Sequence, residues 1–169
     1  IWYAVIGLAL FWGISQVSIA AFPALAKAEL AVTNTLVIQG VLASAGLGIL
    51  VGAVMVARLS RGWIETGLIP LGAIGVTVSL ALIPLAESVW GMALLFLWMG
   101  LFGSLLIVPL NALIQLHAPA AQLGQVLAGN NWIQNSVMFL FLLGTMTLAL
   151  VARPDSGHAT LLFQGMALV

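Results

Sequence analysis

The stretch that decides the fold is Ser88–Ala152, which reads SVWGMALLFLWMGLFGSLLIVPLNALIQLHAPAAQLGQVLAGNNWIQNSVMFLFLLGTMTLALVA. It contains no Asp, Glu, Lys or Arg. A membrane-spanning helix needs about 20 apolar residues, so the stretch is too long for one span and long enough for two. Polar residues and helix breakers occur together only between Gln115 and Gln125. We therefore expect one helix over Val89–Ile114 and another over Gly124–Val151.

The rest of the chain divides into similar apolar runs. These runs predict helices over Ile1–Leu25, Thr35–Ala57 and Gly67–Ala86. The first helix is expected to break near Pro23, because proline lacks the N–H that continues a helix. Ala159–Val169 would open a further helix that is cut short. The sequence thus predicts five complete helices and one truncated helix.

Composition excludes a soluble globular domain. The chain is 63% hydrophobic and 5% charged, with a mean hydropathy of +1.25, whereas soluble domains carry about 25% charged residues. A charge at the centre of a bilayer costs at least about 2.5–3.5 kcal/mol, so charges should collect between spans. They do so in four small groups: Lys27, Glu29; Arg58, Arg61, Glu65; Glu87; Arg153, Asp155. Residues 1–169 are therefore expected to form an all-α, polytopic transmembrane bundle.

Several functions are disfavoured by what the chain lacks. Its net charge is zero and no basic stripe is present, which argues against a nucleic-acid partner. There are no cysteines, and His117 and His158 have no carboxylate at metal-ligand spacing. The spans contain no Ser-His-acid set, no paired carboxylates and no phosphate loop. We expect no metal, no cofactor and no enzymatic activity in this chain.

A stripe of small residues predicts close helix packing. Gly40, Ser44, Gly48 and Gly52 repeat every four residues on the second predicted helix, and Gly100 and Ser104 repeat this spacing on the fourth. Small residues let helix backbones approach closely in lipid. The stripe is typical of plain packing, and sliding surfaces in a moving transporter would use the same residues.

Amides are the polar groups within the predicted spans. Residues that are four positions apart on one helix share a face, so Asn130 lies on the same face as Gln134, and Asn131 on the same face as Asn135. Such groups must face the bundle interior or an aqueous cavity. They either tie helices together or line a solute pathway. The candidate pathway residues are Gln16, Gln39, Asn111, Gln115, Asn130, Asn131, Gln134 and Asn135.

Loop alternation places the Arg58–Glu65 loop and the His117 loop on the same side of the membrane. Because the fourth and fifth predicted helices share a short loop, Asn111 and Gln115 are expected near the membrane face that holds the Asn130 cluster. Basic residues divide equally between the two sides, so the positive-inside count is a tie. Arg58 and Arg61 share one tight loop, which favours a cytoplasmic position for it.

Four strings in the chain resemble one family. They are GLFGSLLIVPLNALIQ at Gly100–Gln115, LAGNNWIQN at Leu127–Asn135, RLSR at Arg58–Arg61 and IETGLIP at Ile64–Pro70. They are similar to lysophospholipid transporters of the major facilitator superfamily. They are similar also to the transporter portion of related proteins in which an acyltransferase and an acyl-carrier-protein synthetase follow.

The resemblance implies the second half of a twelve-helix transporter, helices seven to eleven with the start of twelve. The Arg58–Glu65 loop would then be cytoplasmic, where the superfamily repeats a Gly-x-x-x-Asp-Arg-x-Gly-Arg-Arg motif. Arg58 and Arg61 match basic positions of that motif. Ala57 stands in place of its Asp and Ser60 in place of its second Gly, so the motif is degenerate here.

The function implied by the resemblance is movement or flipping of lysophospholipid across the bacterial inner membrane. The implied partners are lysophospholipid or another small amphipathic substrate, membrane lipids and the missing N-terminal half of the same chain. Asn111, Asn130 and Gln134 would line the head-group pathway. Two alternatives remain: the membrane domain of a fused phospholipid acyltransferase, and a general drug or solute efflux transporter. Both Ile1 and Val169 lie inside apolar runs, so we expect a fragment of a longer polypeptide.

Overall fold

The computed structural model describes residues 1–60 and 62–151, and in these residues it is built from helices without strands. The α-helices are α1 (Trp2–Leu30), α2 (Thr35–Leu59), α3 (Leu68–Leu82), α4 (Val89–His117) and α5 (Leu123–Val151). Short 3-10 helices, Ile83–Leu85 and Ala120–Gln122, follow α3 and precede α5. The predicted helix over Ala159–Val169 lies outside the described residues.

Within the described part of the chain, four helices are long and apolar enough to cross a membrane. They are Trp2–Leu30, Thr35–Leu59, Leu68–Leu85 and Val89–His117. The chain is therefore an all-α helical bundle with the character of a membrane protein, as its composition predicts. α5 has 29 residues, as many as α1, but the amides in its first half make it less apolar.

The prediction that the first helix breaks at Pro23 is wrong. α1 continues without interruption to Leu30 and ends where Ala31 adopts a left-handed conformation with φ 52°. Phe22, Leu25 and Ala26, on either side of the proline, are all at most 2% exposed. Burial of this turn in the core maintains the helix, and prolines are tolerated in membrane helices when neighbouring groups compensate for the lost backbone bond.

Two other helix ends differ from the prediction. α4 passes through the buried Pro109 and ends at His117 rather than Ile114. The third predicted helix ends as an α-helix at Leu82, because Pro84 opens a tighter 3-10 turn instead. The remaining ends agree with the prediction to within two residues.

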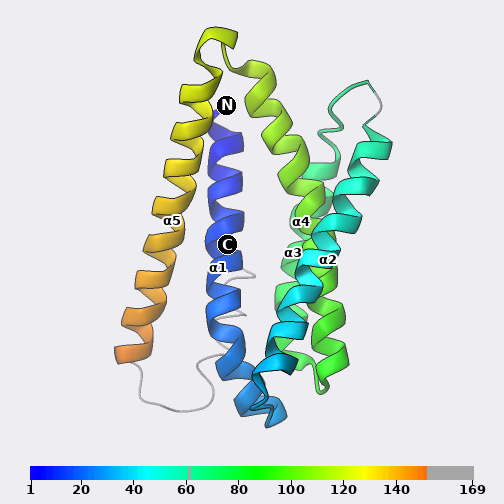
Figure 1. The fold of residues 1–169 in the computed structure, drawn as a ribbon, viewed down its shortest axis with the longest axis vertical. Coiled ribbons are helices and arrows are strands. Elements are labelled where there is room, and N and C mark those ends of the chain that lie inside the picture. The colour runs from blue at the N-terminus through cyan, green and yellow to red at the C-terminus, as the bar shows by residue number, and fades with distance from the viewer. Residues whose placement is uncertain (61, 152–169) are drawn as a thin grey trace.

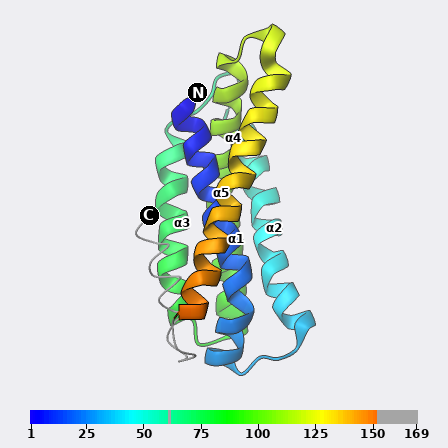
Figure 2. The same ribbon diagram turned by 90° about the vertical axis from the view of Figure 1, so that its left-hand side faces the viewer.

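The helices form two groups that meet at α4. α4 packs against α2 and α3, while α1 packs against α5 and, on its other side, against α4 (Figures 1 and 2). The core between them includes Phe22 and Phe96, whose rings meet edge to face at 4.8 Å. The α2–α3 and α4–α5 loops lie at the same end of the bundle as the start of α1 (Figure 1). We call this the loop end.

α2 and α4 touch backbone to backbone. A Cβ atom added to Gly48 would collide with the carbonyl oxygen of Leu97, and one added to Gly100 would collide with that of Ala45. Two serines join the same helices, in opposite directions. Ser44 Oγ donates to the Ala93 carbonyl at 2.8 Å, and Ser104 Oγ donates to the Ile49 carbonyl at 2.7 Å.

The predicted packing role of the small-residue stripe is confirmed for Ser44, Gly48 and Gly52 on α2 and for Gly100 and Ser104 on α4. It is wrong for Gly40, which is exposed and has no atom within 4 Å of an added Cβ. With 3.6 residues per turn, each four-residue step rotates by about 40° around the helix, so Gly40 is turned away from the side on which Gly48 meets α4.

Candidate functional site

α1 and α4 carry the same pattern of residues. Trp12, Ser18 and Pro23 of α1 recur at identical intervals as Trp98, Ser104 and Pro109 of α4. Both helices have 29 residues, and they run in opposite directions (Figure 1). The sequence offset that aligns α1 with α4 on this pattern also aligns α2 with α5. The pair α1–α5 is then the counterpart of the pair α4–α2.

The two helix pairs differ at the positions that set their spacing. Asn130 and Gln134 of α5 occupy the places of Ser44 and Gly48 of α2. Gly13 of α1 meets the side chains of Phe141 and Val137 at 3.2–3.3 Å, not the backbone of α5. Side chains therefore hold α1 and α5 apart, whereas glycines bring α2 and α4 together.

A cavity of about 580 Å³ opens among α1, α4 and α5 towards the loop end. Its volume falls within the range of about 300–1,000 Å³ that small-molecule sites occupy. An added Cβ at Gly129 would find no atom within 4 Å, so the wall is open at that point. The cavity is lined by Ile1, which precedes α1, by Trp2 and Val5 of α1, His117 of α4, and Val126, Gly129, Asn130 and Ile133 of α5.

Asn130 is the buried polar group of this cavity. It is 4% exposed, and its Oδ1 atom has no hydrogen-bond partner. Among the described residues, Asn130 Oδ1 is the one buried side-chain oxygen or nitrogen atom that has no hydrogen-bond partner. Leaving a buried acceptor unsatisfied costs about 1–3 kcal/mol. Most buried polar groups in proteins have partners, so this exception distinguishes Asn130 among the residues that line the cavity.

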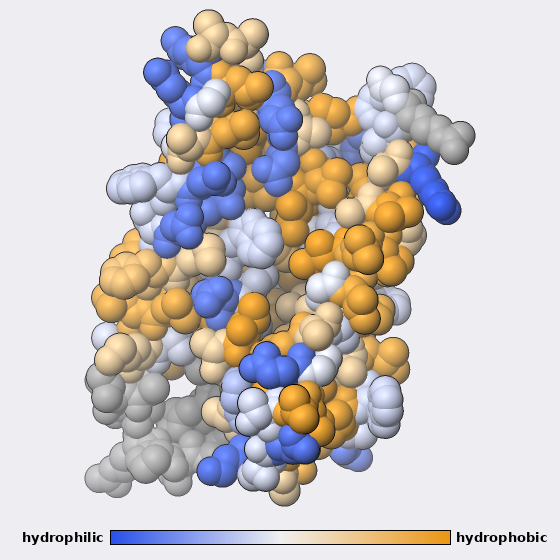
Figure 3. Space-filling model, viewed as in Figure 1, coloured by the Kyte–Doolittle hydropathy of each residue, from blue (hydrophilic) through white to orange (hydrophobic). Residues whose placement is uncertain are grey.

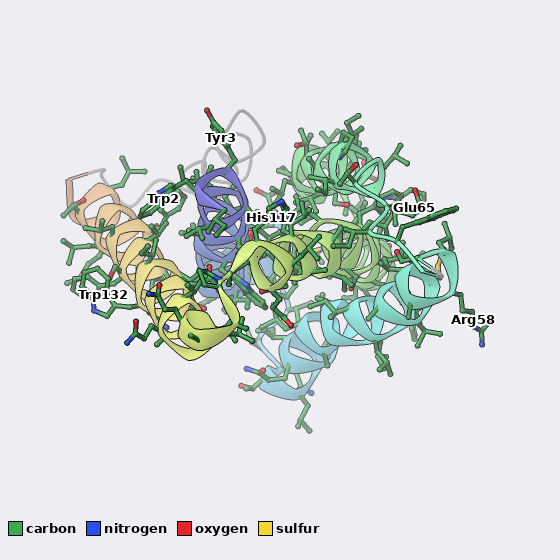
Figure 4. The ribbon with its side chains drawn as sticks, turned by 90° about the horizontal axis from the view of Figure 1, so that it is seen from above. Trp2, Tyr3, Arg58, Glu65, His117 and Trp132 are labelled. Carbon is green, nitrogen blue, oxygen red and sulfur yellow. The ribbon has the colours of Figure 1, made fainter. Side chains whose placement is uncertain are left out.

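His117 lines the same cavity from the end of α4 (Figure 4). Its Nδ1 lies 2.9 Å from the carbonyl oxygen of Leu113. A carbonyl only accepts, so Nδ1 carries the hydrogen of this bond. His117 also lines a second, mostly apolar cavity of about 500 Å³ among α1, α3 and α4.

Sequence analysis placed His117 in a loop and assigned it no role at a site. The missed signal is its helical register. Leu110 and Ile114 are buried in the core, and His117 follows them at the spacing that keeps one helix face. Because the sequence predicts a helix end at Ile114, His117 was not assigned to that face.

The amide cluster of α5 is divided between two faces. Asn130 is buried and Gln134 is half-buried, while Asn131 and Asn135 are exposed. Asn135 Nδ2 donates to the Asn131 carbonyl at 2.8 Å, a bond within the helix. Figure 3 shows hydrophilic residues over the part of α5 nearest the loop end, above a predominantly apolar surface.

The other predicted pathway amides do not line the cavity. Asn111 is half-buried and donates to the Ile107 carbonyl at 3.0 Å. Gln16 is half-buried in α1, while Gln39 and Gln115 are exposed. Asn111 and Gln115 belong to the last turns of α4, and Asn130 to the early turns of α5, so they share the end of the bundle at which α4 and α5 are joined, as expected. They do not line one cavity together, because α5 packs along α1 rather than along α4.

The Arg58–Glu65 loop stands apart from the cavity. Arg58 is exposed in the last turn of α2 and projects away from the bundle (Figure 4), and Glu65 is half-buried. Arg61 lies outside the described residues. Among residues 1–60 and 62–151, no cluster of three or more His, Cys, Asp or Glu residues could hold a metal ion.

The chain has no match among protein-family models, curated proteins or solved structures. Any inference about function therefore rests on the sequence and on the described helices. They define an all-α membrane bundle with one cavity that has an unsatisfied amide in its wall.

Proposed function

We propose that this chain is the second half of a major facilitator superfamily transporter that moves lysophospholipid across the bacterial inner membrane. The observation that carries the proposal is Asn130 of α5, which lines the cavity among α1, α4 and α5 and has a buried Oδ1 without a hydrogen-bond partner. A buried acceptor without a partner is destabilising, and rotation of this side chain towards a polar ligand in the cavity would supply one.

The pattern shared by α1 and α4 supports the choice of superfamily. Each half of such a transporter is built from two three-helix repeats in opposite orientation, and substrates bind where repeats meet. Here α1 would belong to the first repeat, and α4 and α5 to the second. The cavity lies between them.

The walls of the cavity suit an amphipathic substrate. Val5, Val126 and Ile133 supply apolar surface, and Asn130 and His117 supply hydrogen-bonding groups. No Lys, Arg, Asp or Glu side chain is among the residues that line it. Apolar walls with two hydrogen-bonding side chains suit the acyl chain and the uncharged part of an amphiphile, and the phosphate of a lysophospholipid would lie outside this set of side chains.

Uptake of radiolabelled lysophospholipid into proteoliposomes, with the purified full-length protein, tests the function. We expect Asn130→Ala to lower uptake about fivefold, because one hydrogen bond to the substrate is worth about 1 kcal/mol. Gln125→Ala is the matched control, since Gln125 is an exposed amide on the first turns of α5.

Absence of uptake by the unaltered protein would contradict the proposal. Export of unrelated cationic drugs by the same proteoliposomes would favour a general efflux transporter. Acylation of lysophospholipid without its movement across the membrane would favour the membrane domain of a fused acyltransferase.

A further inference from the structure

The length of α3 shows where the hydrocarbon layer of a bilayer would end at the loop end. α3 and the 3-10 turn after it cover Leu68–Leu85, which are 18 residues, between Glu65 and Glu87. At 1.5 Å per residue they span about 27 Å, close to the thickness of about 30 Å of a hydrocarbon core. Leu68 therefore marks the loop-end boundary of the hydrocarbon.

Contacts between helices carry this boundary to α4. Gly72, one turn inside Leu68, lies against Phe102 and Leu106 of α4, which runs antiparallel to α3 (Figure 1). The level of Leu68 on α4 is therefore close to Val108. The turn that joins α4 to α5 stands beyond the loop-end limits of α2 and α3 (Figure 1).

α2 gives the same level independently. Gly52 lies against Leu101 and Ser104 of α4, which runs parallel to α2. Arg58, the basic residue in the last turn of α2, follows Gly52 by six residues. Six residues beyond its contacts, α4 again reaches Val108. A charge at the end of one helix and the start of another thus coincide in depth.

The boundary reaches the amide cluster of α5 through α1. Gly7 of α1 lies against Leu110 of α4, just outside the boundary. Gly13, six residues further along α1, lies against Val137 of α5. Because α1 and α5 run parallel (Figures 1 and 2), the boundary on α5 is about one turn nearer the loop end than this contact, close to Asn135.

We propose that Asn131, Trp132 and Asn135 lie in the head-group layer of the bilayer and bind phospholipid head groups. All three side chains are exposed, Trp132 by 73%. Tryptophan is enriched at membrane interfaces, and amide N–H groups donate to phosphate and ester oxygens. In hydrocarbon the same amides would lack partners, which is costly.

The remainder of this face of α5 is continuous with a lipid-facing surface. Phe139 and Leu140 are 63% and 61% exposed and follow Trp132 and Ser136 at helical spacing. An exposed apolar face that ends in a tryptophan and amides is typical of a helix that leaves the hydrocarbon there. A protein partner over the same face is the competing arrangement, and the experiment separates the two.

The test measures depth with spin labels on single cysteines in the full-length protein, reconstituted into phosphatidylethanolamine–phosphatidylglycerol liposomes. Gln125→Cys, Ala128→Cys, Ser136→Cys and Leu140→Cys follow the exposed face of α5. We expect the first two labels to collide mainly with a water-soluble nickel complex, Leu140→Cys mainly with oxygen, and Ser136→Cys with both. Ile74→Cys, exposed on α3, is the matched hydrocarbon control and should behave as Leu140→Cys does.

A double variant tests the contact with head groups. Asn131→Leu combined with Asn135→Leu should let the hydrocarbon advance about one turn, or about 5 Å, towards the loop end. The label at Ser136 should then collide mainly with oxygen. Gln125→Leu, further outside the boundary, should leave that label unchanged.

Three results would overturn the inference. The label at Ala128 could be as accessible to oxygen as that at Leu140, which would place the amides in hydrocarbon. The labels at Ala128 and Ser136 could be shielded from both reagents, as a protein partner would shield them. The double variant could leave the boundary in place. None of these measurements uses a transport substrate, so their outcome is separate from that of lysophospholipid uptake.

Discussion

At the residue scale, Asn130 and Ser44 show two uses of a polar side chain in equivalent places. Ser44 Oγ lies 2.8 Å from the Ala93 carbonyl oxygen on the facing helix and 2.6 Å from the Val41 carbonyl oxygen on its own helix, so its single hydrogen has an acceptor on either side. Asn130 has an acceptor without a partner, in a wall that is otherwise mostly apolar. The first arrangement stabilises the bundle, whereas the second leaves a buried acceptor unsatisfied at the expense of stability.

Replacing Asn130 with leucine should therefore stabilise the empty protein while impairing its function. Removing an unsatisfied buried acceptor relieves a penalty of about 1–3 kcal/mol, and sites built for function are often unfavourable for folding. We expect Asn130→Leu to raise the thermal midpoint in detergent and to lower lysophospholipid uptake. Ser44→Ala should lower the midpoint. If Asn130→Leu also melts earlier than the parent, the amide has a structural role after all.

At the element scale, the helices were largely predictable from the sequence, because spans of about 20 apolar residues separated by charges leave few alternatives. The continuity of the helices through Pro23 and Pro109 was not predictable, because it depends on burial that only the packed bundle provides. The site was half predictable. Spacing identified Asn130 and Gln134 as one face, but it could not show that α5 lies on α1, which excludes Asn111 from the cavity.

The α2–α4 contact provides a test that is independent of function. Gly48→Leu should lower the yield of folded protein, because any side chain there collides with the Leu97 carbonyl and overpacking costs at least about 1–3 kcal/mol. Gly40→Leu is the matched control on the same helix, with open space around it. Yield is measured as the monodisperse fraction in size-exclusion chromatography. Equal yields for the two variants would contradict the close contact.

At the scale of the whole molecule, the bundle has two chemically distinct ends. The α2–α3 and α4–α5 loops mark the loop end, and the α1–α2 turn with Thr33 lies at the opposite end (Figure 1). The family resemblance implies that the loop end faces the cytoplasm. The cavity would then open towards that side of the membrane.

Orientation can be measured directly because the chain contains no cysteine. Thr33 and Ala121 are both exposed and lie at opposite ends. A membrane-impermeant maleimide applied to intact cells should label Thr33→Cys and spare Ala121→Cys until the cells are permeabilised. The reverse pattern would invert the proposed topology.

The α1–α5 contact also bears on how the chain is made. α5 packs along α1, although α2, α3 and α4 are synthesised between these two helices. The side of α1 that faces α5 therefore has no α5 to cover it until the ribosome has completed α5. Closure of this side of the bundle is thus a late event in biosynthesis, while the α2–α4 contact can form earlier.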